Sequence, residues 1–322
     1  MRIVVTGSEG SLMQAVIPKL LANGHEVVGI DNLYRYGKRS ERAGQDYEFH
    51  EQDLVDRHAT FELLRGADAV IHAAAKLYGV LGLLHYRADI LGDDTAVCSN
   101  ILHAAVHHGV KRVVYMSSSM VYDSSIQDVN VPLTENMTDT CPMPKTDYGL
   151  SKLVCERMCE AFRQQYGLEY TIWRPFNVVS PHEVSMTEQG FSHVLPDFIN
   201  NIVGRHLNPL PIIGDGEQIR CFTWIDDVTQ IIADHSFCEA SANQVFNVCN
   251  VEPTRMKDAA RMIYFAATGN DPRELKFITS RDYEHDVRVR IPSVDKLHRI
   301  LGPFQFTSTQ ESIRRCLKQA LS

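Results

Sequence analysis

Residues 2–13 read RIVVTGSEGSLM, an apolar run followed at once by a turn that contains two glycines. Arg2–Thr6 is typical of a buried β-strand, and Leu12–Asn23 is typical of a helix that ends at a glycine. Between them, Gly7 and Gly10 let the backbone approach a pyrophosphate, whose charge then lies at the helix N-terminus. The stretch therefore predicts a dinucleotide site at the first strand of an α/β fold.

The next strand ends in a carboxylate that suits the same ligand. Glu26–Ile30 is predicted as the second strand, and Asp31 follows it, about 20 residues after the glycine turn. An acidic residue at this place accepts hydrogen bonds from the adenosine ribose, and it repels a 2′-phosphate. We therefore expect NAD rather than NADP as the cofactor. The alternative is a glycine turn that holds no nucleotide.

Strands and helices alternate through the first half of the chain. This alternation predicts an α/β fold with a doubly wound parallel sheet, of Rossmann type, and helices on both faces. Residues 1–175 are expected to form this NAD-binding domain and to carry the catalytic residues. The further strands expected are Tyr47–His50, Ala69–His72, Arg112–Met116 and Glu169–Trp173, and the long helices are Ala88–His108 and Tyr148–Tyr166.

After Arg174 the regular alternation ends. We expect residues 176–322 to form a smaller C-terminal α/β substrate lobe, with some segments returning to the sheet. Ligands of open α/β sheets bind at the carboxyl ends of the strands, so the lobe is expected to cover that edge. Its predicted elements are strands Pro211–Ile213 and Val245–Val248, and helices Phe191–Arg205, Asp226–Cys238, Arg255–Ala267, Ser293–Leu301 and Thr309–Leu321.

The composition argues against several other functions. The 322 residues carry a formal net charge of −8, whereas nucleic-acid binding requires a basic surface, so no nucleic-acid partner is expected. The eight cysteines lack the spacing of a metal site, and no metal is predicted. Neither a signal peptide nor a run of about 18 apolar residues is recognised. We therefore expect a cytoplasmic protein with no membrane partner.

A tyrosine and a lysine one helical turn apart supply the candidate catalytic base. Tyr148 and Lys152 lie at positions i and i+4 of a predicted helix, so they share a face. The lysine charge lowers the phenol pKa from its usual value near 10, and a bound oxidised nicotinamide adds to this effect. One hydroxyl of the run Ser117–Ser119, which ends the fifth strand, is placed to hydrogen-bond the same substrate oxygen. Together these groups predict proton abstraction coupled to hydride transfer.

On these motifs, the chain resembles the extended short-chain dehydrogenase/reductase family, in its NAD-dependent nucleotide-sugar epimerase and dehydratase branch. The resemblance covers nearly the whole chain, and it implies that Ser118, Tyr148 and Lys152 are the catalytic residues. It implies cofactor binding by Gly7, Gly10, Ser11, Leu12, Asp31, Asn32, Asp53, Leu54, Ala73, Ala74, Ala75, Tyr148 and Lys152. It implies substrate binding by Lys76, Ser119, Met120, Tyr122, Asn177, His193, Val194, Arg220 and Arg290.

Further motifs carry the same resemblance. His72–Ala75 matches the family's cofactor-lining HxAA motif, and Arg174–Asn177 matches its Arg-Pro-x-Asn segment. In the second lobe, residues 214–220 and 286–290 resemble the two arginine motifs that hold the nucleotide phosphates. The arginines at the ends of these two segments would supply the local positive charge that an acidic protein needs to bind a UDP- or GDP-linked sugar.

The residues beside the catalytic serine narrow the reaction. Family dehydratases carry an Asp-Glu pair where this chain has Ser119 and Met120, and the related decarboxylases usually keep a Glu at the second position. The chain also resembles GDP-fucose synthase and GDP-mannose 3,5-epimerase locally. These enzymes use a Cys where Met120 stands, and a thioether moves no protons. His193 matches the acid of fucose synthase and is either a substrate contact or a buried structural histidine. We therefore expect epimerisation at carbon 4 through a transient 4-keto sugar.

The sequence leaves two alternatives open. One is a nucleotide-sugar 4-keto reductase or 4-oxidase, which turns over NAD(H) stoichiometrically. The other is a non-catalytic, regulatory nucleotide-binding protein, because Met13, Asp94 and Asp123 depart from the residues that the family usually has. The resemblance also implies a homodimer, formed through the apolar faces of Ala88–His108 and Tyr148–Tyr166, although the same faces suit ordinary packing.

Overall fold

The computed structural model describes residues 1–35, 37, 46–127, 131–183, 185, 190–280 and 286–320, so Leu321, the predicted end of the last helix, lies outside the described residues. At the centre is a seven-stranded sheet in the order β11-β6-β5-β4-β1-β2-β3, and every neighbouring pair is parallel. The winding direction reverses between β1 and β4, which opens a crevice at the carboxyl ends of these strands. The strands are β1 (Arg2–Thr6), β2 (Glu26–Asp31), β3 (Glu48–Glu51), β4 (Ala69–His72), β5 (Arg112–Met116), β6 (Glu169–Pro175) and β11 (Gln244–Val248).

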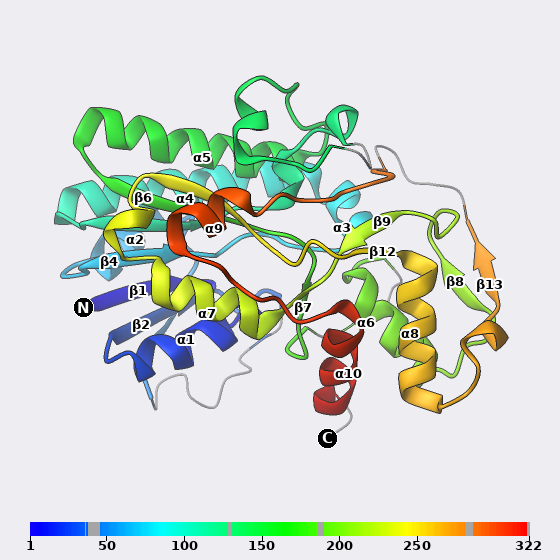
Figure 1. Ribbon diagram of the computed structural model, residues 1–322. Helices are drawn as coiled ribbons and strands as arrows, with labels where there is room; N and C mark the ends of the chain where they lie inside the picture. The colour runs from blue at the N-terminus through cyan, green and yellow to red at the C-terminus, as the bar shows by residue number, and fades with distance from the viewer. Residues whose placement is uncertain are drawn as a thin grey trace.

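Helices cover both faces of this sheet, as Figure 1 shows. Alternate residues of β1 point to opposite faces, so Ile3 and Val5 enter one apolar core and Val4 enters the other. The first core is closed by α1 (Met13–Ala22), α7 (Ile225–His235) and α9 (Asp295–Leu301). The second core is closed by α2 (Arg57–Leu63), α4 (Arg87–His108) and α5 (Asp147–Tyr166). The predicted doubly wound α/β fold is therefore confirmed.

The C-terminal part of the chain builds a second lobe and also returns to the sheet. β11, which contains the predicted strand Val245–Val248, extends the large sheet beside β6, and α7 packs on α1. A third apolar core lies within the lobe, among α6, α8 and α10. The lobe's elements are β7 (Val178–Val179), α6 (Val194–Ile199), β8 (Leu210–Ile212), β9 (Ile219–Cys221), β10 (Thr223–Trp224), β12 (Pro253–Arg255), α8 (Met256–Thr268), β13 (Phe277–Thr279) and α10 (Thr309–Ala320).

Several elements differ from the expectation, including the short strands β7, β9, β10, β12 and β13, which were not predicted. The predicted helix Phe191–Arg205 begins at Val194, and its last part, Asn200–Gly204, is π-helical. The short helices α2 and α3 (Val80–His85) were not predicted. The remaining short helical turns are η1 (Ser119–Val121), η2 (Ser124–Ile126), η3 (Glu135–Asp139), η5 (Glu239–Ser241) and η6 (Pro272–Glu274).

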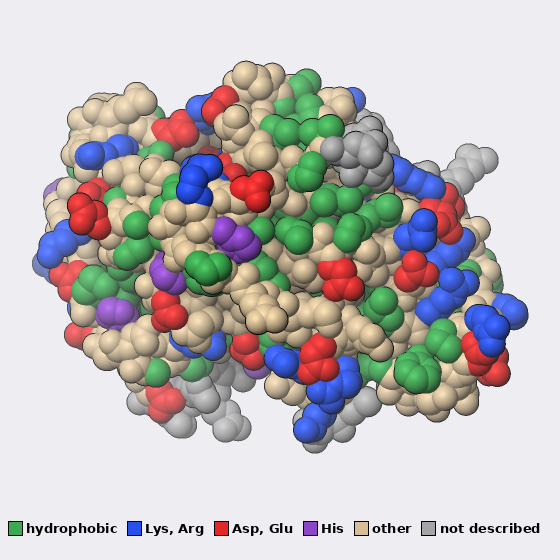
Figure 2. All heavy atoms as spheres, viewed as in Figure 1, with side chains coloured by type: hydrophobic (Ala, Val, Ile, Leu, Met, Phe, Trp, Pro, Cys, Tyr) green, Lys and Arg blue, Asp and Glu red, His purple; other side chains and the backbone are tan. Residues whose placement is uncertain are grey.

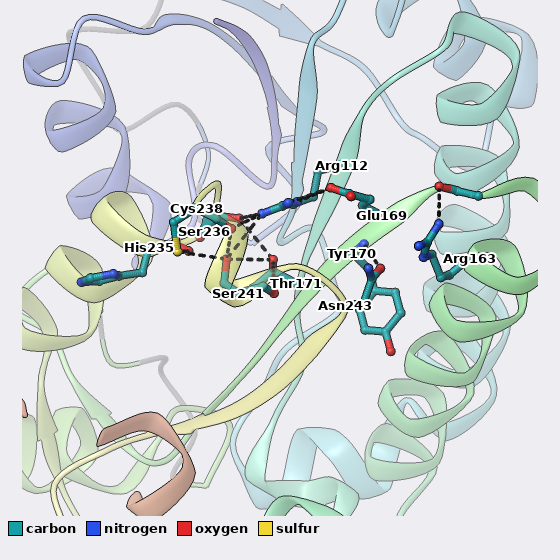
Figure 3. Close-up of polar contacts among 11 residues, drawn as sticks. Arg112, Arg163, Glu169, Tyr170, Thr171, His235, Ser236, Cys238, Ser241 and Asn243 are labelled. Atoms are coloured by element: carbon teal, nitrogen blue, oxygen red, sulfur yellow. Dashed lines mark hydrogen bonds and ion pairs between the residues drawn. The ribbon is translucent and has the colours of Figure 1, made fainter. Parts of the chain in front are cut away.

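A buried arginine ties the loop after α7 to the sheet (Figure 3). Arg112 on β5 donates a hydrogen bond to Glu169 Oε2 on β6 at 2.7 Å and another to the Cys238 carbonyl at 2.6 Å. Thr171 Oγ1 on β6 donates to the Ser241 carbonyl at 3.0 Å and holds the same loop. These contacts fix the loop to β5 and β6 just before the chain enters β11.

We expect Arg112→Met to lower the free energy of unfolding by about 2–3 kcal/mol, because it leaves buried carbonyl oxygens without their charged donor. Urea denaturation followed by circular dichroism measures this loss. Arg163→Met is the matched control, since Arg163 donates only to the Gly167 carbonyl, at 3.1 Å, on the exposed end of α5. The control is expected to change stability by less than about 0.5 kcal/mol. Equal losses in the two variants would contradict the structural role given to Arg112.

The surface mixes charges of both signs. On the face shown in Figure 2, the described Lys and Arg side chains are interspersed with Asp and Glu. All eight cysteines are free thiols. Among the described residues, no helix has both the length and the apolar composition that crossing a bilayer requires.

Candidate active site

A cavity of about 470 Å³ lies at the carboxyl ends of the central strands, where the second lobe meets the sheet. Its volume is in the range of sites that enclose small ligands. The glycine turn, the segments after β2, β4 and β5, the start of α5 and the second lobe all line it. All the predicted site residues lie around this one cavity: Gly7, Gly10, Ser11, Leu12, Asp31, Asn32, Asp53, Leu54, Ala73, Ala74, Ala75, Lys76, Ser118, Ser119, Met120, Tyr122, Tyr148, Lys152, Asn177, His193, Val194, Arg220 and Arg290.

The glycine turn forms a close-fitting cradle between β1 and α1. Gly7 has a φ of +68°, in the left-handed region that favours glycine, and its N–H donates to the Ile30 carbonyl at 2.8 Å. A Cβ on Gly7 would lie 2.8 Å from the backbone nitrogen of Ala74. Met13, which stands where the family has a glycine, turns its side chain into the core and is 1% exposed. The turn is thereby kept open to the cavity despite this departure.

Asp31 is held in place by the backbone. Its two carboxylate oxygens accept hydrogen bonds from the N–H of Leu33 at 2.8 Å and of Glu9 at 3.0 Å. Burial raises the pKa of this carboxyl, and the two N–H donors oppose that effect. Asn32 donates to Asp53 Oδ2 at 3.2 Å, which joins the segments after β2 and β3. This arrangement presents a fixed acceptor at the place expected for the adenosine ribose.

The candidate catalytic pair lies on the first turns of α5. Thr146 caps this helix by accepting a hydrogen bond from the Gly149 N–H at 3.2 Å, and Tyr148 is the second residue of the helix. Lys152 donates from Nζ to the Met116 carbonyl at 2.9 Å, and the same nitrogen lies 5.6 Å from the centre of the Tyr148 ring. The Ser118 hydroxyl lines the same cavity and is close enough to the Tyr148 phenol to lower its pKa. The end of β5 and the start of α5 therefore bring the serine, the phenol and the ammonium together.

The ionisation of this pair is set by burial and by charge. Burial raises the pKa of the Tyr148 phenol, whereas Lys152 and the Ser118 hydrogen bond lower it only in part, so the net shift is upward. The lysine effect thus has the expected sign, but the protein alone keeps the phenol protonated near neutral pH. Burial by itself would lower the pKa of Lys152, but the negative charge of Asp94, and that of Tyr148 once the phenol ionises, outweigh it and raise that pKa. Lys152 is therefore a permanent cation beside the phenol.

Two arginines face the cavity from adjacent strands of the second lobe. The segment around Val289 pairs with β9 at Ile219, which places Arg220 and Arg290 at neighbouring positions. Arg290 donates to Gln127 Oε1 at 3.1 Å, and Arg220 lies 3.5 Å from Asp286 Oδ1. The pair is suited to hold a diphosphate.

Some predicted substrate residues are already bonded within the protein. The Tyr122 hydroxyl donates to Asn247 Oδ1 at 2.7 Å and accepts from Arg174 at 3.0 Å, and Arg174 is in turn paired with Glu156 at 2.5 Å. The Tyr122 side chain is only 2% exposed, so its ring reaches the cavity wall but its hydroxyl is committed to this buried network. Asn177, for its part, donates to the Cys221 carbonyl at 3.2 Å.

His193 forms a charged pair that the sequence did not reveal. Its Nδ1 lies 2.6 Å from Glu183 Oε1, the Glu183 side chain is 5% exposed, and both residues line the cavity. Partial loss of solvent inside the cavity works against charge on both groups, but their mutual attraction raises the pKa of His193 and lowers that of Glu183. The His193 side chain is 46% exposed, which is inconsistent with a buried structural histidine.

Several lining residues were missed by the sequence analysis, and three of them make polar contacts with predicted site residues or with each other, namely Glu183, Gln218 and Asp286. Gln218 donates to Asp286 Oδ2 at 2.8 Å, and the same carboxylate faces Arg220. The Asp286 carboxylate, itself held by Gln218, therefore helps to orient the Arg220 guanidinium. For Gln218 and Asp286, the signal in the sequence was that each lies in one of the two arginine segments, close to Arg220 or Arg290.

Fold and cavity define a dinucleotide-dependent enzyme built on a parallel sheet. Residues 3–249 match the NAD dependent epimerase/dehydratase family. The chain therefore belongs to this family, and NAD is its cofactor. The Gly7 cradle, which any side chain would fill, and the fixed Asp31 carboxylate suit the pyrophosphate and the adenosine ribose of that cofactor.

Several characterised proteins resemble this chain. GDP-mannose 3,5-epimerase of Arabidopsis thaliana is 27% identical over 269 residues, which are 82% of this chain and 68% of the relative. GDP-L-fucose synthase 1 of the same plant is 28% identical over 238 residues, 69% of this chain and 70% of the relative. The crystal structure of UDP-glucose 4-epimerase from Thermotoga maritima has a TM-score of 0.82 at 24% identity and covers 100% of both chains. The UDP-glucose 4-epimerase of Thermus thermophilus with NAD has a TM-score of 0.85 at 23% identity, covering 100% of this chain and 99% of that one. These structures share the fold.

Proposed function

We propose that the protein epimerises a nucleotide-diphosphate sugar, linked to UDP or GDP, at carbon 4 through a transient 4-keto intermediate. The observation that carries this proposal is the Tyr148 phenol, set between Ser118 and Lys152 in the cavity. Ser119 and Met120, which line the cavity beside Ser118, carry no group that ionises near neutral pH and could remove a proton from carbon. The groups present support hydride transfer at the carbon whose hydroxyl gives up its proton.

In the proposed mechanism, Tyr148 accepts the proton of the carbon 4 hydroxyl and later returns it to the same oxygen, once the 4-keto sugar has turned to present its other face. Ser118 holds the substrate oxygen by a hydrogen bond, and the ammonium of Lys152 stabilises the phenolate. Bound NAD supplies the hydride acceptor and the hydride donor of the cycle. Arg220 and Arg290 hold the diphosphate, so that the sugar turns over while the nucleotide stays bound.

The test incubates purified protein with UDP-glucose, UDP-N-acetylglucosamine and GDP-mannose without added cofactor, and looks for the 4-epimer of each by proton NMR. We expect one of them to be interconverted until it reaches equilibrium with its epimer. Absence of interconversion for all three, in protein that binds NAD, would sink the proposal.

A second candidate is a nucleotide-sugar 4-keto reductase. The His193–Glu183 pair favours it, because it places a second proton donor in the cavity. The relative GDP-L-fucose synthase also favours it. A reductase consumes one reduced nicotinamide per product, visible as a loss of nicotinamide absorbance, whereas the epimerase leaves that absorbance unchanged after many turnovers.

We expect Arg220→Met and Arg290→Met each to raise KM for the nucleotide sugar about 30-fold, equivalent to about 2 kcal/mol, with a smaller change in kcat. Each arginine is expected to bind the diphosphate equally strongly in the ground state and in the transition state, so its loss affects KM more than kcat. Arg288→Met is the matched control, because Arg288 lies two residues before Arg290 in the same segment but pairs with Asp215 at 2.7 Å on the surface. Initial rates at varied substrate concentration measure the effect, and an equal rise in the control would count against phosphate binding.

We also propose that the protein is a cytoplasmic homodimer. The eight free thiols suit a reducing compartment. α4 and α5 lie side by side at one edge of the molecule in Figure 1, and Leu91, Val154, Met158 and Phe162 on these helices are half-buried in the single chain. Sedimentation equilibrium of the purified protein tests the dimer, and a monomer at micromolar concentration would exclude it.

A further inference from the structure

We propose that Asp94 is the counter-charge of Lys152 and keeps the Tyr148 phenol protonated to a higher pH than Lys152 alone would allow. Asp94 would thus be a positioning residue that acts on the catalytic pair through charge. The inference rests on the catalytic roles proposed above for Tyr148 and Lys152, and it assigns a function to a residue that departs from the family's usual amide.

The placement of Asp94 is the first support. It is 5% exposed on α4 and lines the same cavity as Tyr148 and Lys152. Its Oδ2 accepts a hydrogen bond from Ser151 Oγ at 3.4 Å, and its backbone carbonyl accepts one from Cys155 Sγ at 3.7 Å. Because Ser151 and Cys155 flank Lys152 along α5, Asp94 lies against the turn of helix that carries the ammonium.

The hydrogen bonds of Asp94 suit a carboxylate. Its Oδ1 accepts from the backbone N–H of Lys76 at 2.9 Å, and its Oδ2 lies 3.4 Å from the Ser151 hydroxyl, which also donates to the Tyr148 carbonyl at 2.9 Å. Burial raises the pKa of Asp94, and the charge of Lys152, the Lys76 N–H and the Ser151 hydroxyl offset only part of that rise. An ionised Asp94 is therefore supported by three groups that favour its charge.

The other ionisable groups around Asp94 leave Lys152 as its main partner. Asp93, the next residue on α4, pairs with Lys76 Nζ at 2.5 Å, so these two charges offset each other. The thiols of Cys98 and Cys155 stay neutral, because their pKa values are raised above the ordinary range for a thiol. Tyr115 is also neutral, since burial raises its pKa.

The sign of the effect follows from these charges. Lys152 favours the phenolate of Tyr148, and the negative charge of Asp94 favours the protonated phenol. In the proposed cycle, Tyr148 takes up a proton in one half and returns it in the other. An uncompensated Lys152 would favour the phenolate more strongly and slow the return of the proton. By opposing the charge of Lys152, Asp94 allows Tyr148 both to take up the proton and to return it.

The test is Asp94→Asn, which removes the charge but keeps the shape. The amide oxygen still accepts from the Lys76 N–H, and the amide nitrogen donates to Ser151 Oγ, so the fold is expected to persist. Protein labelled with carbon-13 at the tyrosine Cζ is titrated by NMR with NAD bound, and Tyr148→Phe in each background identifies the Tyr148 signal. We expect Asp94→Asn to lower the ionisation midpoint of Tyr148 by about one pH unit or more.

Asp93→Asn is the matched control, because it removes the same charge one residue away. Its Tyr148 midpoint is expected to stay within about 0.3 pH units of the unmodified protein, a shift worth about 0.4 kcal/mol. An unchanged midpoint in Asp94→Asn, or equal shifts in both variants, would overturn the proposal. The titration needs no sugar substrate, so it can succeed or fail independently of the 4-epimerase assay.

Discussion

Tyr148→Phe is expected to lower kcat about 10³-fold, the contribution of a well-placed general acid–base group, and to leave the dissociation constant for NAD within about twofold. The substitution removes the phenol oxygen and keeps the ring, which packs in a small apolar cluster with Tyr78 and Ile90. The fold and the cofactor site are therefore preserved while the proton acceptor is lost. Initial rates on the substrate found by the epimer screen, with NAD titrated by quenching of intrinsic fluorescence, measure both quantities.

Tyr166→Phe serves as the control for this prediction. Tyr166 ends the same helix and is 48% exposed, far along α5 from the cavity. Its loss is expected to change neither kcat nor NAD binding. Retention of more than about a tenth of the activity in Tyr148→Phe would show that another group accepts the proton, since a displaced general base costs at least 10²-fold. The His193–Glu183 pair would then be the next candidate.

The features that the sequence predicted well are local ones. The glycine turn, Asp31 and the Tyr148–Lys152 pair each depend on residues close together in the chain, and strand or helix periodicity fixes their direction. The parallel sheet then brings them to one edge, because the carboxyl ends of all its strands lie on the same side. Local pattern and a single topological rule were therefore enough to locate the cavity.

What was missed depends on contacts between distant segments. Gln244–Val248 reads as a strand, but its position beside β6 follows from tertiary packing that includes the Arg112 contacts of Figure 3. α2 depends on a cap, in which Asp56 accepts a hydrogen bond from the Ala59 N–H, within a segment of weak apolar periodicity. Glu183 is ten residues from His193, and no helix or strand period relates the two.

The role of Tyr122 shows a different limit. The family resemblance implied a substrate contact for Tyr122, yet its hydroxyl bonds to Asn247 on β11. That strand joins the sheet only through long-range pairing with β6. Polar side chains near a catalytic motif thus serve either the ligand or the core, and the hydrogen-bond partners of the folded protein decide between them.

Gly7→Ala is expected to weaken NAD binding by at least about 30-fold, or about 2 kcal/mol. An alanine at a φ of +68° costs about 1–2 kcal/mol of backbone strain, which lowers the stability of the fold with or without NAD. Its Cβ would also lie 2.8 Å from Ala74 N and 2.9 Å from Ala74 Cα, so the turn and the segment after β4 must separate. Both segments line the cofactor cavity, and their separation displaces the backbone that faces the pyrophosphate.

Gly24→Ala separates these two effects. Gly24 has a φ of +77°, close to that of Gly7, but a Cβ there meets no atom within 4 Å. It is expected to lower the free energy of unfolding by about 1–2 kcal/mol through strain alone and to leave the NAD dissociation constant unchanged. Isothermal titration calorimetry with NAD, together with urea denaturation, distinguishes the outcomes. If both variants lost only stability and both bound NAD normally, the contact between Gly7 and Ala74 would not be what keeps the pyrophosphate site open.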